Sequence, residues 1–76
     1  MNKTRREKLF KITEQLCDLK SQIEILRDEE QESFDALPDS LQASAGGVKS
    51  DEACQMLGDA IDSLEEADTH LTGAQE

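Results

Sequence analysis

The sequence contains no tryptophan or tyrosine, and its only aromatic side chains are two phenylalanines. Proteins that bind single-stranded nucleic acid usually stack the bases on aromatic side chains. The chain also has few cations, and its net charge of −10 opposes contact with nucleic acid and anionic membranes. We therefore expect no direct nucleic-acid binding and no membrane association.

Sites for metals and cofactors are lacking too. The chain has two cysteines, Cys17 and Cys54, and one histidine, His70, with no CxxC or HxxxH spacing. No apolar run approaches the ~18 residues of a membrane span. The first residues, MNKTRREKLFKI, hold no apolar segment typical of a secretion signal. We expect a cytoplasmic protein with free thiols, no cofactor and no metal.

Catalytic motifs are equally scarce. Gly46-Gly47 leads through Lys49 to Ser50 but lacks the spacing and the GK[ST] triplet of a phosphate loop, so we interpret it as a flexible linker. Both cysteines lie beside apolar positions, where cysteine serves as a small hydrophobic residue. An enzyme also needs a concave pocket, which two helices hardly provide. We predict that the protein is not an enzyme.

What the sequence does contain is a heptad pattern in its first half. Six apolar residues are spaced by three and four in alternation, which predicts a helix that packs against another helix. The capping-box pair Thr4 and Glu7 indicates a start near residue 4, and Pro38 an end near residue 36. The seam consists of Leu9, Ile12, Leu16, Leu19, Ile23 and Leu26.

A second helix is predicted over residues 51–72, after a linker over 37–50. Ser50 is the expected N-cap, and Gly73 suits the position just past the C-terminus. Alanines alternate with larger apolar residues, and this alternation favours close helix packing. The apolar positions expected in the seam are Leu57, Ile61, Leu64 and Leu71.

The charges set the direction of the two helices. Residues 1–11 carry five cations against Glu7, whereas residues 28–76 carry fourteen acids against Lys49. An antiparallel hairpin places the acidic end of the second helix beside the basic start of the first. The first helix is expected to be about ten residues longer, so part of its seam lacks a partner. We therefore predict an all-α single domain, 1–76, a hairpin that forms a homodimeric four-helix bundle or a coiled-coil oligomer.

A resemblance supports this architecture. The segment DEEQESFDALPDSLQAS (28–44) is followed by the acidic helix AIDSLEEADTHL (60–71). Across roughly residues 5 to 72 the chain resembles small acidic helical proteins of bacterial prophages and mobile elements. These proteins combine an acidic run, an aromatic residue and an L-P-[DE]-S-L-Q turn. The resemblance implies a phage or mobile-element context in a host cytoplasm, and it assigns no site residue.

Function is therefore sought on the surface. Carboxylates along a rod can replace the phosphates of a duplex in a basic groove, so we expect a host protein with a basic surface as partner and an inhibitory role against host defence. Two alternatives stay open: an oligomeric nucleotide-binding protein that uses Lys3, Arg5 and Arg6, and a purely structural helical module. The acids expected to bind the partner are Asp28, Glu29, Glu32, Asp35, Asp59, Asp62, Glu65 and Glu66.

Overall fold

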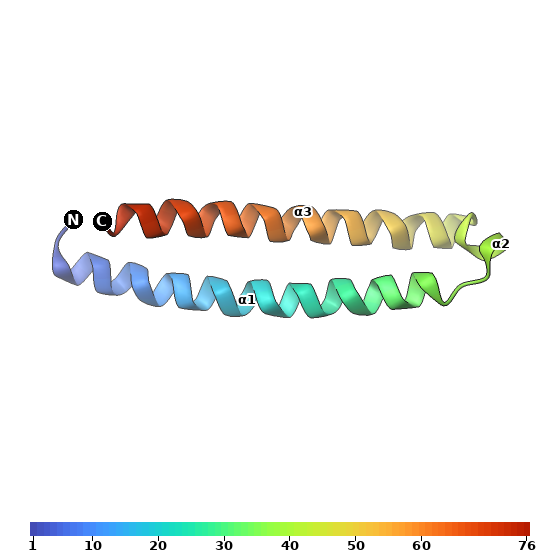
Figure 1. Ribbon diagram of the computed structural model, residues 1–76, viewed down its shortest axis with the longest axis horizontal. Coiled ribbons are helices and arrows are strands. Elements are labelled where there is room, and N and C mark those ends of the chain that lie inside the picture. Colours follow the sequence, from blue (N-terminus) through green and yellow to red (C-terminus); the bar gives the residue numbers. More distant parts are fainter.

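The computed structural model describes residues 1–76 and consists of three helices with no strand. The long helices α1 (Lys3–Asp35) and α3 (Ala45–Ala74) lie side by side in opposite directions, joined by the short helix α2 (Asp39–Gln42). The two termini therefore meet at one end of the molecule, and α2 lies at the other (Figure 1). The molecule is a rod of 58 × 15 × 13 Å.

Helix α1 begins two residues earlier than a Thr4 cap would give. The side chain of Asn2 accepts a hydrogen bond of 2.8 Å from the backbone N–H of Arg5, so Asn2 is the N-cap and the capping box expected of Thr4 and Glu7 does not start the helix. At the other end, the side-chain amide of Gln42 donates to the carbonyls of Phe34 and Leu37. These bonds join Gln42 of α2 to the last turn of α1 and to the residue just before Pro38.

The connection between the long helices is much shorter than predicted. The linker expected over 37–50 is wrong, because α2 occupies part of it and α3 already begins at Ala45. Ser44 rather than Ser50 is the N-cap of α3, and its hydroxyl accepts from the N–H of Gly47 at 3.3 Å. Gly47 is buried at this corner, where a side-chain carbon would overlap the carbonyls of Leu41 and Gln42. The glycine therefore permits a close approach of backbones rather than mobility.

The far end of α3 also differs from the prediction, because the helix runs through Gly73 to Ala74. With 33 residues in α1 and 30 in α3, the two helices are almost equal in length. The expected excess of about ten residues is wrong. The greater length of the first helix was the reason to expect that part of its seam lacks a partner within the chain. That reason for a second chain is therefore removed.

Little of the chain is fully buried. Only Gly47, Cys54 and Ile61 fall in the buried class, and all three belong to α3. Two packed helices share a single line of contact, so most apolar residues between them stay half-exposed. No helix carries an apolar stretch of the length and low charge that a membrane span requires.

Candidate protein-binding surfaces

One row of α1 faces α3, and it differs from the predicted seam. Its residues are half-buried and alternate by four and three along the helix. Leu9, Leu16 and Ile23 belong to both rows. The polar residues Thr13, Lys20 and Arg27 replace the other half of the predicted seam. We call this set the inner row: Leu9, Thr13, Leu16, Lys20, Ile23, Arg27, Glu30 and Phe34.

The opposing row of α3 contains the expected large residues. Ile61 is 4% exposed and Cys54 is 7% exposed, while Leu57, Leu64 and Leu71 are half-buried. With the half-buried Asp68 these positions alternate by three and four, which matches the periodicity of the inner row on α1. Sequence reasoning thus found the core positions of α3 but gave half of the α1 seam the wrong orientation.

The remaining seam residues of α1 lie on the surface. Ile12 is 46% exposed, Leu19 is 53% exposed and Leu26 is 56% exposed. The cause is geometric: the apolar stripe of α1 is wider than one neighbouring helix can cover, and α3 packs on one side of it. Ile12, Leu19 and Leu26 lie seven residues apart, so they form one row along the helix.

A row of alanines on α3 borders the same side of the molecule. A shallow groove at this border is lined by Leu26, Glu29, Glu30 and Ser33 of α1 with Ala53 and Leu57 of α3. Residues seven apart lie on one face of a helix, so the other members of both rows follow this groove along the pair. We call this surface the apolar face: Ile12, Leu19 and Leu26 of α1 with Ala53, Ala60 and Ala67 of α3.

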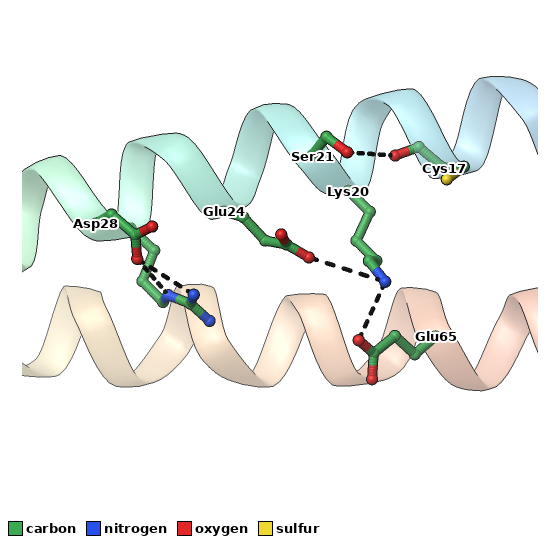
Figure 2. Close-up of polar contacts among 7 residues, drawn as sticks. Cys17, Lys20, Ser21, Glu24, Asp28 and Glu65 are labelled. Atoms are coloured by element: carbon green, nitrogen blue, oxygen red, sulfur yellow. Dashed lines mark hydrogen bonds and ion pairs between the residues drawn. The ribbon is translucent and has the colours of Figure 1, made fainter.

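The opposite groove between the helices is polar. Figure 2 shows Lys20 reaching from α1 to Glu65 on α3, with Nζ and Oε1 separated by 3.1 Å, and Glu24 at 3.8 Å from the same Nζ. Hydrogen bonding to Glu65, with the nearby charges of Glu65 and Glu24, raises the pKa of Lys20 above its ordinary value. This interhelical ion pair links α1 and α3 on the side away from the apolar face. Leu16, Cys17, Leu64, Asp68 and Thr69 complete the lining of this groove.

A second polar contact fixes the helices near the connecting end. The hydroxyl of Ser50 donates to a carboxylate oxygen of Glu30 at 2.7 Å. Glu30 therefore belongs to the inner row and contacts α3. Together, the Lys20–Glu65 and Glu30–Ser50 contacts define the register of α1 against α3.

All eight acids expected to bind a partner are exposed. They do not form one patch, however, because Glu30 lies beside Ser50 whereas Lys20 lies beside Glu65. The acids of residues 28–35 and those of residues 59–66 consequently occupy different lengths of the rod. We call the two sets together the acidic outer surface: Asp28, Glu29, Glu32, Asp35, Asp59, Asp62, Glu65 and Glu66.

Few cations neutralise this acidic outer surface. Glu65 pairs with Lys20, and Asp28 lies 3.2 Å from the guanidinium of its neighbour Arg27. Glu66 lies 3.8 Å from the ring of His70, a pair that is ionic only when the histidine is protonated. The other five carboxylates of the surface form no ion pair.

The basic N-terminus contacts no acid of α3, although the charge pattern predicted such pairing. No ion pair involves residues 1–11. The guanidinium of Arg6 instead donates to the carbonyl oxygen of Met1 at 2.7 and 3.0 Å. Lys3 and Arg5 are exposed, and no hydrogen bond links their side chains to another group. A single chain therefore forms no converging anion site at the predicted residues.

The two cysteines lie in different environments. Cys17 is exposed beside the polar groove, and Cys54 is buried between the helices, with both thiols free. Burial raises the pKa of the Cys54 thiol, and the nearby carboxylates Glu30 and Asp51 raise it further. Cys54 is therefore a neutral core residue at physiological pH. No group of three histidine, cysteine, aspartate or glutamate side chains has a geometry that could hold a metal ion.

Sequence reasoning missed the polar members of the inner row and the role of Gly47. The signal for the former was present in the spacing Leu9, Leu16, Ile23, with Thr13, Lys20 and Arg27 at the intervening heptad positions.

Comparison with protein-family models, curated proteins and solved structures gives no match. The function is consequently argued from the surface alone.

Proposed function

We propose that this protein acts without catalysis, by binding a basic surface of another protein through its acidic outer surface. The observation that supports this best is the exposure of all eight acids along a rod of 58 Å, with five of them outside any ion pair. Unpaired carboxylates in two groups along a rod attract a complementary cationic surface over distances longer than a contact. Such an array specifies the charge of a partner rather than one small ligand.

A basic nucleic-acid-binding groove is the partner surface that fits this array. Its arginines and lysines are spaced to meet phosphates along a duplex, and carboxylates on a narrow rod can occupy the same positions. Binding of this kind would block the groove and inhibit the protein that carries it. With the phage or mobile-element context that the resemblance implies, the proposed role is inhibition of a host defence protein.

The proposal is tested by capture from a bacterial lysate on the immobilised chain, followed by affinity measurements with the identified protein. The bound protein should be basic, should dissociate as salt rises, and should be displaced by duplex DNA. Replacing three acids of α3 by their amides (Asp59→Asn, Asp62→Asn, Glu66→Gln) should weaken binding by about tenfold or more.

A matched control removes the same number of charges elsewhere. The control variant carries Glu7→Gln, Glu14→Gln and Asp18→Asn, which neutralise three exposed acids in the N-terminal half of α1. This control should leave the affinity within about twofold of the original, because it lies outside the acidic outer surface. Equal losses in both triple variants, or binding that salt does not affect, would contradict the proposal.

We also infer that the helix pair is a hairpin that associates with itself, as the expected four-helix bundle requires. The apolar face supports this part of the proposal, since large side chains at heptad spacing lie open on it. The nucleotide-binding alternative has no such support, because Lys3, Arg5 and Arg6 do not converge within one chain.

A further inference from the structure

The apolar face is the least acidic long surface of a chain whose net charge is −10. Next to the alanine row of α3 lie residues that include no acid: Lys49, Met56, Ser63 and His70. Next to Ile12, Leu19 and Leu26 on α1 lies a row with one cation, two amides and one acid: Lys8, Gln15, Gln22 and Glu29. All four of these side chains are exposed.

We propose that the apolar face is the interface between two copies of this chain, related by a twofold axis at Leu19 that sets α1 antiparallel to α1 of the second copy. The proposal rests on the inferred self-association and shares only Glu29 with the acidic outer surface. It specifies the face, the direction and the register of the pairing. A twofold interface must be self-complementary, so each residue on one side of the axis needs a suitable partner on the other.

The apolar row on α1 meets this requirement. Ile12 precedes Leu19 by seven residues and Leu26 follows it by seven. An antiparallel partner with its axis at Leu19 therefore places Ile12 opposite Leu26 of the second copy, and Leu19 opposite itself. The exposed parts of these side chains, about half of each, would interdigitate and leave water, which is the main favourable term in helix association.

The flanking row is complementary in charge under the same axis. Lys8 lies eleven residues before Leu19 and Glu29 lies ten residues after it. The axis therefore brings Lys8 beside Glu29 of the second copy, twice in each dimer, and Gln15 beside Gln22. Opposite charges at such flanking positions set partner orientation in helical assemblies.

The contacts between α1 and α3 extend the match to the second helix. In the antiparallel pair the Lys20–Glu65 contact places Leu19 beside residue 66 of α3, and the Glu30–Ser50 contact places it beside residue 61. Leu19 therefore lies alongside Leu64, between these two positions. Leu64 lies between Ala60 and Ala67 along the chain, so the same axis sets Ala60 opposite Ala67 of the second copy. Small side chains at these positions let the two α3 helices approach closely. One axis thus satisfies the rows of both helices.

The other twofold arrangement, with α1 over α3 of the second copy, fits less well. It sets the flanking row of α1, which begins with Lys8, against a row of α3 that offers no carboxylate: Lys49, Met56, Ser63 and His70. It also moves Leu19 away from its own symmetry mate. A cysteine at residue 19 therefore distinguishes the two arrangements.

The test uses cysteine crosslinking in a chain carrying Cys17→Ser and Cys54→Ala. Leu19→Cys should form a covalent dimer under mild oxidation, because the two thiols meet at the axis. Ile12→Cys should not, since its symmetry mate lies about 20 Å away along the helix. Ile25→Cys is the control for random collision, because Ile25 is 58% exposed on a different face. Circular dichroism confirms that each variant is helical.

Each other result overturns part of the account. Equal crosslinking of Ile12→Cys and Leu19→Cys indicates parallel pairing and contradicts the register. A chain that is dimeric by sedimentation but does not crosslink through residue 19 uses another face or arrangement. A chain that is monomeric at every concentration overturns the self-association itself. None of these results bears on the salt-sensitive binding through the acidic outer surface.

A charge swap tests the same axis without thiols. Lys8→Glu and Glu29→Lys should each raise the dimer dissociation constant by about tenfold, and the double variant should restore it, because the pair is rebuilt with reversed signs. Lys11→Glu with Glu32→Lys makes the same charge changes on exposed residues outside the face. This matched pair should show no restoration. Equal behaviour of the two double variants would overturn the Lys8–Glu29 pairing.

Discussion

At the scale of the residue, Gly47 determines the corner between α2 and α3. The glycine is buried, and a side-chain carbon there would lie 2.7 Å from the carbonyl carbon of Gln42. Its neighbour Gly46 has only the Ser44 hydroxyl nearby, at 4.0 Å. Two adjacent glycines with the same sequence signature therefore have different structural roles.

We expect Gly47→Ala to destabilise the fold by about 1–3 kcal/mol, because the added methyl group overlaps backbone atoms that cannot move independently. Gly46→Ala is the matched control and should be neutral or stabilise by up to about 1 kcal/mol, through the higher helix propensity of alanine. Urea unfolding at equal chain concentrations measures both. Similar free energies of unfolding for the two variants would show that the corner is not closely packed.

The buried thiol gives the fold a dependence on alkaline pH. The pKa of Cys54 is raised above its ordinary 9.0, so the folded chain retains this proton more tightly than the unfolded chain. The resulting stabilisation is fully present below about pH 9 and is lost as the pH rises through the folded value. The pKa of Lys20 is also raised, so the fold loses further stability as the pH rises above 10.5, the ordinary pKa of lysine.

We therefore expect the free energy of unfolding to fall as the pH rises above about 9, and to fall less in Cys54→Ala. Cys17→Ala is the control, since Cys17 is exposed and its removal should leave the pH dependence unchanged. Urea unfolding in a series of buffers provides the comparison. A decline of equal slope in both variants would show that the Cys54 thiol does not cause it.

At the scale of the element, periodicity predicted the helical class and the large core residues of α3. It did not predict which side of the α1 stripe faces α3, because Leu9, Leu16 and Ile23 fit either of two adjacent rows. The choice depends on long polar side chains, since Lys20 in the inner row reaches Glu65 across the groove. Hydrophobic spacing alone contains no information about such a contact.

The helix ends were predicted less well, for a related reason. Asn2 and Thr4, and likewise Ser44 and Ser50, are all suitable N-caps by residue type. The structure uses Asn2 and Ser44, while Ser50 contacts Glu30 instead. Glycines 46 and 47 suggested a mobile linker, but the second is required by packing against α2. Tertiary contacts decide between local choices that propensity leaves equal.

At the scale of the whole molecule, two surfaces differ in character. The apolar face carries open large side chains and few charges, and the acidic outer surface carries exposed carboxylates on both long helices. We propose that the first joins two copies and the second binds a basic protein. Pairing through the apolar face would leave most of the acidic outer surface free, and it would double the number of carboxylates available to one partner.

The mass of the protein in solution, measured by sedimentation equilibrium over a range of concentrations, tests the inferred use of the apolar face most directly. Leu26 and Ile25 are neighbours with similar exposure, 56% and 58%, but only Leu26 belongs to that face. The original chain and Ile25→Ser should both show twice the mass of one chain, and Leu26→Ser should shift toward the mass of a single chain. A single-chain mass for the original protein, or equal behaviour of the two serine variants, would contradict the account.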